Sequence, residues 1–220
     1  MTSPPDLQDI RSRLNTALLS DALDEAGHRH QAFSAATRPL DAALVLCGRA
    51  RTAIYVEVCE VPPGHNPYAL EIALIDSLAE GEVAVMACGG SQRIAPWGAL
   101  LTTASHVRKA AGCITDGFVR DTQAIREMQF PVFHRGIAPL DSKGRGEVQA
   151  IDVPVTCDGV RVASGDLVFG DADGVVVIPR HVEAEVLRLA FAKLDKEIDS
   201  FALLRQGKSL REVFALHGIL

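Results

Sequence analysis

Two short segments of the chain carry residue types that could do chemistry. The first is Pro96-Trp97-Gly98, at the expected start of a helix, where the first backbone N–H groups have no intrahelical partner. The helix dipole adds partial positive charge there, so such a turn can hold a carboxylate or a phosphate. The expected binding groups are the N–H groups of Gly98, Ala99, Leu100 and Leu101. Taken alone, Pro-Trp-Gly also fits a plain helix start.

The second segment is Arg120-Asp121, which follows the turn at Asp116-Gly117. A guanidinium can hold a carboxylate or a ketone oxygen in a fork geometry. A carboxylate is a ligand for a hard divalent cation such as Mg²⁺, which commonly keeps several waters beside one or two protein carboxylates. An isolated Arg-Asp pair is usually a solvated ion pair, so its position in the fold decides its meaning.

The elements around these segments form two consecutive strand-loop-helix units. Residues 83–88 are a continuous apolar run, typical of a strand buried on both faces, and Pro96 is expected as an early residue of a helix that ends at Gly112. Residues 113–115 predict the next strand, and Asp121 is a plausible N-cap for a helix through 128. Successive units of this kind favour neighbouring parallel strands whose loops open on one edge of the sheet. The sequence therefore predicts that Arg120 and Asp121 lie close to the Gly98 turn.

The remaining pattern predicts one α/β domain over residues 1–220 with mixed sheets and flanking helices. Helices are expected at 7–14, 20–27, 68–78 and 181–204, and a short tail after the last of them. Two strands are expected at 43–47 and 50–59, separated by Gly48, and shorter ones at 153–157, 160–162, 167–169 and 175–178.

Composition excludes several classes of protein. The 22 Lys and Arg against 28 Asp and Glu give a net charge of −6, which argues against a nucleic-acid partner. No apolar run reaches the length needed to span a membrane, and the first residues lack the pattern of a signal peptide. The 5 cysteines are widely spaced and indicate free thiols in a reducing compartment. We expect a cytoplasmic protein without a membrane partner.

Other candidate sites are weaker. His28 and His30 could supply metal nitrogens but have no third ligand nearby in the sequence. Residues 171–174 imitate the opening of a calcium loop without its later ligands, which favours a hairpin turn. Arg135, Lys143 and Arg145 could form an anion patch, but a solvated loop is the preferred interpretation.

Five segments, in chain order, carry a family resemblance. They are S-D-A-L-D at 20–24, G-R-A at 48–50, G-C-I-T-D-G-F-V-R-D at 112–121, and the stretches 165–179 and 207–214. Together they resemble the RraA-like family, which includes 4-hydroxy-4-methyl-2-oxoglutarate aldolases, oxaloacetate decarboxylases and regulators of ribonuclease E. D-G-x-x-R-D is the most specific of these elements.

The resemblance implies a swivelling β/β/α fold, assembled as a homotrimer or as a dimer of trimers with active sites between subunits. The N- and C-terminal helices are then expected at oligomer contacts. Arg120 and Asp121 would be the catalytic residues, with Asp121 as ligand of Mg²⁺ or Mn²⁺, and the substrate would be bound by Arg120 and the amides of residues 98–101. The family's aldolases often carry Asp or Glu where this chain has Ala99. Glu197 is a candidate for a carboxylate contributed by a neighbouring subunit.

The leading functional hypothesis is a divalent-metal-dependent lyase acting on short 2-oxo acids. It would cleave a 4-hydroxy-2-oxo acid by retro-aldol reaction, decarboxylate oxaloacetate, or both, and release pyruvate. No lysine adjoins the Arg120-Asp121 motif to suggest a Schiff base, and the sequence does not identify the general base. One alternative is a non-enzymatic regulator that binds a ribonuclease through its acidic surface. Another is an enzyme for a different oxo acid, with a pocket altered at Ala99.

Overall fold

The computed structural model describes residues 6–219. The helices are α1 (Leu7–Arg13), α2 (Thr16–Glu25), α3 (Ala69–Asp76), α4 (Ala99–Val107), α5 (Thr122–Glu127), α6 (Glu183–Arg205) and α7 (Leu210–His217). The strands of the first half are β1 (Arg38–Pro39), β2 (Leu46–Glu57), β3 (Glu82–Ala87), β4 (Gly112–Thr115) and β5 (Phe118–Val119). Those of the second half are β6 (Val132–His134), β7 (Gly136–Ile137), β8 (Gly146–Ile151), β9 (Val155–Cys157), β10 (Val160–Val162), β11 (Leu167–Asp171) and β12 (Gly174–Ile178).

The main sheet is mixed and nearly closes on itself. Its order is β1-β6-β4-β3-β2-β11-β12, with β8 also paired to β2. Strands β2, β3, β4 and β6 run parallel to one another, whereas β1, β8, β11 and β12 each pair antiparallel with a neighbour. The Phe33 N–H donates to the Val175 carbonyl over 2.9 Å, which brings the chain ahead of β1 onto β12 at the far end of the series. The predicted α/β class with mixed sheets and flanking helices is confirmed.

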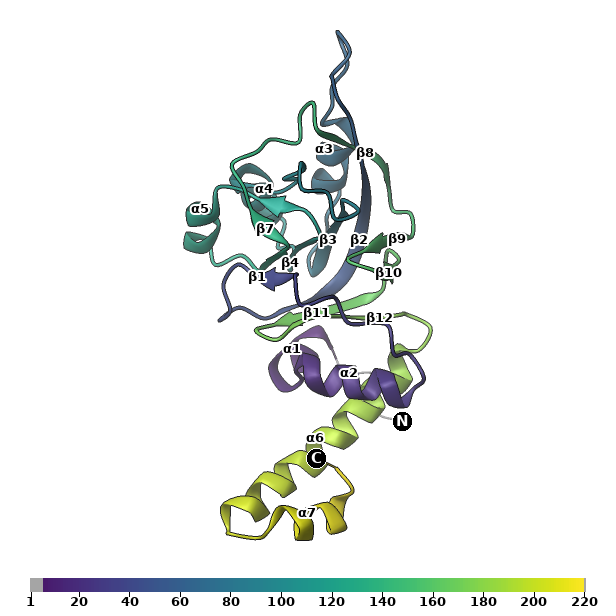
Figure 1. The fold of residues 1–220 in the computed structure, drawn as a ribbon, viewed down its shortest axis with the longest axis vertical. Helices are drawn as coiled ribbons and strands as arrows, with labels where there is room; N and C mark the ends of the chain where they lie inside the picture. The colour runs from purple at the N-terminus through teal and green to yellow at the C-terminus, as the bar shows by residue number, and fades with distance from the viewer. Residues whose placement is uncertain (1–5, 220) are drawn as a thin grey trace.

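The central strand β3 is buried on both faces, as its apolar run predicted. Val83 and Val85 point into a cluster inside the curved sheet, together with Phe133 and Val177. On the opposite face, Met86 lies in a second cluster with residues of α3 and α5. Because α3, α4 and α5 cover this outer face, the loops that follow β3 and β4 emerge among them (Figure 1).

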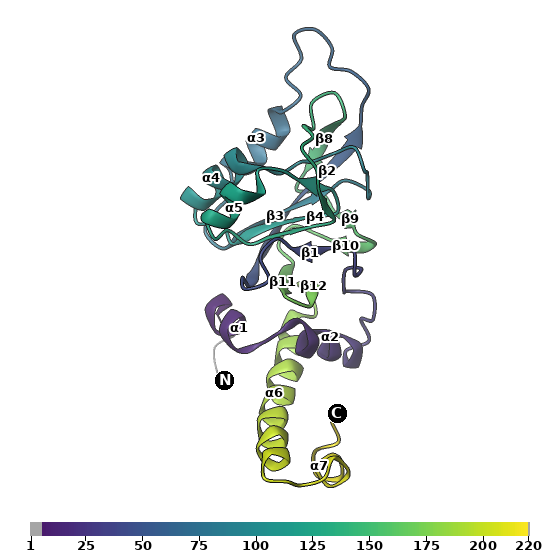
Figure 2. The ribbon, with the colours of Figure 1, turned by 60° about the vertical axis from the view of Figure 1, so that its left-hand side comes forward.

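A third cluster joins the terminal helices to the outer face of the β11–β12 hairpin. Ile10 and Leu19 pack there with Phe169 and Val186. Beyond this cluster α6 continues away from the sheet and α7 folds back beside it, forming an arm at one end of the molecule (Figures 1 and 2). We find no helix within residues 6–219 with the length and apolar character that crossing a bilayer requires.

The prediction of two strands separated by Gly48 is wrong, since β2 runs without interruption from Leu46 to Glu57. Gly48 serves close packing instead. A Cβ added there would lie 2.4 Å from the Gly81 carbonyl oxygen and 2.8 Å from a methyl group of Val83. Apolar periodicity could not separate this need for space from a strand break, because glycine marks both.

The ends of two helices also differ from the prediction. Helix α4 begins at Ala99 with Gly98 as its N-cap, so Pro96 precedes the helix rather than opening it. The tail expected after α6 contains helix α7, whose Ser209 and Glu212 form a capping box. The S-x-x-E spacing of these two residues is a helix-start signal that could have revealed α7. The sequence also did not predict the strands β1, β5, β6, β7 and β8.

Candidate active site

The loops after β3 and β4 meet at one edge of the sheet, as their order along the chain predicted. Strands β3 and β4 are parallel neighbours, with Met86 opposite Thr115 at their carboxyl ends. Beyond these ends, Trp97 forms a parallel bridge with Val119, and the Arg120 N–H donates to the Trp97 carbonyl over 3.0 Å. These backbone contacts fix Arg120 beside the start of α4.

Asp121 lies across the first turn of α4. It occupies the N-cap position of α5 with φ 57°, in the left-handed region, and makes no side-chain cap. Its Oδ2 atom instead accepts the Ala99 N–H over 3.1 Å. The expectation of four open amides is therefore corrected at Ala99. Within residues 6–219, the N–H groups of Leu100 and Leu101 remain without a protein acceptor at this helix start.

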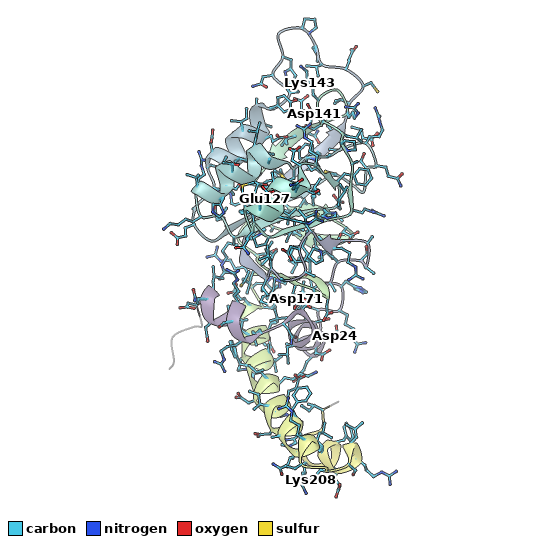
Figure 3. The ribbon with its side chains drawn as sticks, turned by 90° about the vertical axis from the view of Figure 1, so that its left-hand side faces the viewer. Asp24, Glu127, Asp141, Lys143, Asp171 and Lys208 are labelled. Carbon is cyan, nitrogen blue, oxygen red and sulfur yellow. The ribbon has the colours of Figure 1, made fainter. Side chains whose placement is uncertain are left out.

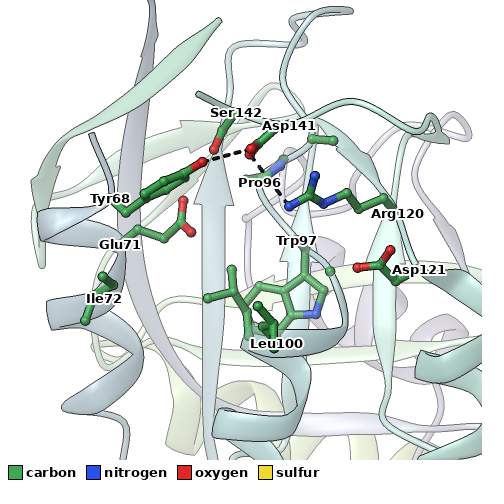
Figure 4. Close-up of a pocket in the computed structure, with 13 residues that line it drawn as sticks. Tyr68, Glu71, Ile72, Pro96, Trp97, Leu100, Arg120, Asp121, Asp141 and Ser142 are labelled. Carbon is green, nitrogen blue, oxygen red and sulfur yellow. Dashed lines mark hydrogen bonds and ion pairs between the residues drawn. The ribbon is translucent and has the colours of Figure 1, made fainter. Parts of the chain in front are cut away.

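Arg120 is oriented by a chain of polar contacts from two other elements (Figure 4). Its Nη2 lies 3.7 Å from Asp141 Oδ1, and Asp141 Oδ2 accepts the Tyr68 hydroxyl over 2.8 Å. Burial and this hydrogen bond raise the pKa of Tyr68 to about 12. Burial alone would raise the pKa of Asp141, but hydrogen bonds from Tyr68 and from backbone N–H groups outweigh it and lower that pKa. At neutral pH, Tyr68 is thus a phenol that donates to an ionised Asp141.

A second carboxyl group, Glu71, faces the same space from helix α3. Glu71 is 7% exposed, and its Oε2 accepts the hydroxyl of the buried Tyr55 over 2.6 Å. Burial raises the pKa of Glu71, and the hydrogen bond from Tyr55 offsets only part of that rise. Burial also holds the pKa of Tyr55 well above its ordinary value, so Tyr55 donates this hydrogen bond.

Together these residues enclose a cavity of about 380 Å³, a volume suited to a small organic ligand. Trp97 is 1% exposed and is held by a hydrogen bond from its Nε1 to Thr102 Oγ1 and by stacking on Phe130. The cavity is lined by Tyr68, Glu71, Ile72, Ala95, Pro96, Trp97, Gly98, Leu100, Leu101, Arg120, Asp121, Asp141 and Ser142. It therefore combines an apolar wall with convergent polar groups, the usual composition of a ligand site.

Sequence reasoning missed three of the polar groups in this cavity. Tyr68 and Glu71 are three residues apart and so share one side of the segment that leads into α3. The pattern counted Tyr68 as an apolar position only, although this spacing could have paired it with Glu71. Asp141 belongs to a loop without periodicity, and no sequence signal connects it with Arg120.

The site fits a hard divalent cation rather than a structural zinc ion. Oδ2 of Asp121 already accepts the Ala99 N–H, whereas Oδ1 has no donor among residues 6–219. In the same part of the chain, no group of three or more His, Cys, Asp or Glu residues is arranged to hold a metal ion. A single open carboxylate oxygen beside a cavity suits Mg²⁺, which keeps waters and substrate atoms as its remaining ligands.

The weaker candidates take other roles. His28 packs edge-on against His181, with ring centroids 5.8 Å apart. Residues 171–174 form the predicted hairpin turn, with Asp171 opposite Gly174. Arg145 donates from Nη1 to the Asp141 carbonyl over 3.2 Å and so stabilises the loop that carries Asp141. Glu197 belongs to α6, which lies at the opposite end of the molecule from α3 and α4 (Figure 2).

Figure 3 shows how far the cavity lies from the α6–α7 arm. Asp141 and Lys143 are at one end of the molecule, and Lys208, between α6 and α7, is near the other. A residue of the α6–α7 arm therefore does not reach the cavity of its own chain.

Comparison with known proteins places the chain in a family. The RraA-like family model, described as Aldolase/RraA, matches residues 16–177. A Halalkalibacterium halodurans protein provisionally named 4-hydroxy-4-methyl-2-oxoglutarate aldolase is 34% identical over 181 residues, covering 81% of this chain and 79% of that protein. The 4-hydroxy-4-methyl-2-oxoglutarate aldolase of Thermus thermophilus is 33% identical over 134 residues, covering 60% of this chain and 78% of that protein.

A solved structure extends the similarity over nearly the whole chain. Streptomyces coelicolor RraAS2, described as an unusual member of the RNase ES inhibitor RraA protein family, superposes with a TM-score of 0.75 at 27% identity. The match covers 92% of this chain and 98% of that one. The fold, the aligned sequence and the order of the motifs agree, and the chain belongs to the RraA-like family.

Proposed function

We propose that this protein is a divalent-metal-dependent lyase that breaks the C3–C4 bond of a short 2-oxo acid and releases pyruvate. The substrate is a 4-hydroxy-2-oxo acid cleaved by retro-aldol reaction, oxaloacetate cleaved by decarboxylation, or both. The observation that carries the proposal is the contact between Asp121 Oδ2 and the Ala99 N–H. This contact brings the Asp121 carboxylate, the start of α4 and the Arg120 guanidinium together around one cavity. The names of the two aldolase relatives support C–C cleavage.

Each part of the cavity has a task in this proposal. The free N–H groups of Leu100 and Leu101 bind the substrate carboxylate, where the helix dipole favours negative charge. Arg120, held by Asp141, donates to the 2-oxo oxygen and stabilises the charge that develops there as the bond breaks. Trp97 and Ile72 exclude water from one side of the substrate. Asp121 would hold Mg²⁺ or Mn²⁺. When bound, this ion supplies Lewis-acid stabilisation of the same charge.

We propose further that the cavity is completed in a homotrimer or a dimer of trimers. Two apolar side chains at the cavity, Ile72 and Leu100, are 46% and 85% exposed in the single chain. The α6–α7 arm also exposes Phe201 and Phe214. These exposed apolar surfaces support contacts between copies of the chain, and the terminal helices take part in those contacts. Glu197 of one copy then reaches the cavity of a neighbour. All five cysteines are free thiols, which supports a cytoplasmic location.

A second candidate function is that of a non-enzymatic regulator of a ribonuclease. The description of the Streptomyces coelicolor structure as a member of an RNase ES inhibitor family favours it. The net charge of −6 is compatible with binding a basic protein surface. Tight binding to a ribonuclease, together with no pyruvate release from any 2-oxo acid, would decide for this function.

The test of the lyase proposal is steady-state pyruvate release in Mg²⁺, in Mn²⁺ and in a chelator. Oxaloacetate and 4-hydroxy-4-methyl-2-oxoglutarate are the first substrates, followed by a panel of 2-oxo acids that covers a pocket altered at Ala99. We expect Asp121→Asn to lose at least about 100-fold in metal-dependent turnover, because a Lewis acid contributes several kcal/mol. Asp173→Asn is the control, since Asp173 is an exposed residue of the β11–β12 turn. Wild-type turnover by Asp121→Asn would show that the metal site lies elsewhere.

A further inference from the structure

Glu71 is a buried carboxyl group for which the mechanism above has no use. This residue is 7% exposed, lines the cavity and accepts a hydrogen bond from the Tyr55 hydroxyl. Figure 4 shows its carboxylate directed toward the space between Tyr68 and Trp97, on the side of the cavity opposite Arg120 and Asp121. Burying a carboxyl group costs free energy that an apolar side chain of similar size would not incur. The hydrogen bond from Tyr55 engages Oε2, and within residues 6–219 no donor engages Oε1.

The other carboxyl groups of the cavity are already engaged. Asp121 accepts the Ala99 N–H through Oδ2 and offers Oδ1 to a cation. Asp141 accepts the Tyr68 hydroxyl and pairs with Arg120. Of the three carboxyl groups that line the cavity, Glu71 is thus the one left to exchange a proton with a bound molecule.

The surroundings of Glu71 suit proton transfer. Burial raises its pKa, and Asp141 in the neighbouring loop adds to the rise. Tyr55 on β2 donates a hydrogen bond that lowers the pKa, and the Arg120 guanidinium also lowers it. Cys88, at the end of β3, has a thiol whose pKa is raised by burial, so it stays uncharged. Because the rise prevails, Glu71 exchanges its proton closer to neutral pH than an ordinary glutamate does.

We propose, resting on the lyase function above, that Glu71 is the proton-transfer residue of this reaction. In retro-aldol cleavage, the Glu71 carboxylate takes the proton of the 4-hydroxyl group while the C3–C4 bond breaks. The bonding pair passes to C3 and gives the pyruvate enolate, and C4 becomes a carbonyl carbon. Protonated Glu71 then delivers that proton to C3, which forms pyruvate and restores the carboxylate.

Oxaloacetate decarboxylation uses the opposite starting state of the same group. The C3–C4 bonding pair again passes to C3 as CO₂ leaves, and protonated Glu71 donates its proton to C3. Glu71 then regains a proton from water. The rate of aldol cleavage therefore rises with pH through the Glu71 titration, whereas the rate of decarboxylation falls.

The experiment measures exchange of the C3 protons of pyruvate in D₂O by ¹H NMR, with Mg²⁺ present. The variants are Glu71→Gln and Tyr55→Phe, and the control is Glu80→Gln, an exposed glutamate paired with Lys109. We expect Glu71→Gln to slow exchange by about 10²- to 10⁴-fold, the usual contribution of general acid–base catalysis. Its pyruvate-induced thermal shift should persist, because the binding groups are unchanged.

Two further readouts do not depend on the folding of Glu71→Gln, and the second of them does not depend on turnover either. Tyr55→Phe removes the hydrogen bond that lowers the Glu71 pKa. The pH limbs, which are the rise of the aldol-cleavage rate and the fall of the decarboxylation rate with pH, should therefore both move to higher pH. The maximal rates should stay within about threefold of wild type. In the metal-free protein, an infrared titration follows the band of the protonated Glu71 carboxyl group. The pH midpoint of this band should also move to higher pH in Tyr55→Phe.

The outcomes separate the two proposals. No exchange and no pyruvate release by the wild-type protein would overturn the lyase function and the role of Glu71 with it. Wild-type exchange that survives in Glu71→Gln within about threefold would overturn the role of Glu71 and leave the lyase function standing. If Tyr55→Phe shifts neither the pH limbs nor the pH midpoint of the carboxyl band, the role of Glu71 is likewise overturned and the lyase function stands.

Discussion

Gly98 is the position at which one methyl group should separate activity from stability. An added Cβ would lie 2.7 Å from Asp121 Oδ2 and 3.2 Å from Arg120 Cγ. Ordinary van der Waals contact for such atoms is about 3.5 Å, so in Gly98→Ala the Asp121 carboxylate must move by about 0.8 Å. Arg120 must give way on the same side. Both proposed catalytic side chains are thus displaced by a change that alters no charge.

The expected loss of activity is large, because displacing a reacting group by about 1 Å costs about 10²-fold in rate. We therefore expect kcat/KM for pyruvate release to fall by about 10²-fold, equivalent to about 2.7 kcal/mol of transition-state stabilisation. The effect on folding should be small. Gly98 is extended, with φ −158° and ψ −171°, so alanine fits its backbone. A poorer N-cap costs up to about 1 kcal/mol, or about 4 °C in Tm at this chain length.

The assay combines steady-state kinetics with thermal unfolding followed by circular dichroism. Gly159→Ala is the matched control, because Gly159 has φ +83° and an added Cβ would meet no heavy atom within 4 Å. That variant should lose about 1–2 kcal/mol of stability through its left-handed backbone and keep its activity. A folded Gly98→Ala with wild-type kcat/KM would refute the placement of the active site at Arg120 and Asp121.

Three other predictions concern positioning, pH and packing. Tyr68→Phe removes the hydrogen bond to Asp141, so we expect kcat/KM to fall about tenfold, mainly through KM; an unchanged KM would contradict this role. Burial lowers the pKa of His134 to about 4 from 6.5. The unfolded chain therefore binds a proton that the folded chain refuses, and stability falls as the pH drops from about 6.5 to 4. Urea unfolding at pH 7 and 4.5 should show a loss of about 2–3 kcal/mol that His134→Leu lacks. Gly48→Ala should lose about 3 kcal/mol in the same assay, because its Cβ would meet the Gly81 carbonyl at 2.4 Å.

Much of the fold could be predicted because it depends on local patterns. The apolar run at residues 83–88 required a strand covered on both sides, and β3 is such a strand. The order strand, loop, helix, repeated once, required parallel neighbours with loops on one edge, which brought Arg120 and Asp121 to the Gly98 turn. Periodicity and connection rules suffice for these features, since they concern residues that follow one another in the chain.

Local patterns failed where one residue serves a distant neighbour. Gly48 resembled a strand break, yet it makes room for the Gly81 carbonyl from another segment. Asp121 resembled an ordinary N-cap, yet its left-handed backbone turns the carboxylate toward Ala99. The residue types were the expected ones in both cases. Their partners differed, because propensity describes the backbone of a residue and not what packs against it.

The sequence by itself determined the family, the α/β class and the two catalytic candidates Arg120 and Asp121, because adjacent residues and their order carry that information. Tertiary structure alone decided how those candidates are oriented and which other groups surround them. Tyr68 and Asp141 are 73 positions apart in the chain, and they meet because α3 and the loop before β8 pack on the same end of the sheet. The protonation of Glu71 is set by burial against Tyr55, and desolvation exists only after packing has removed the water.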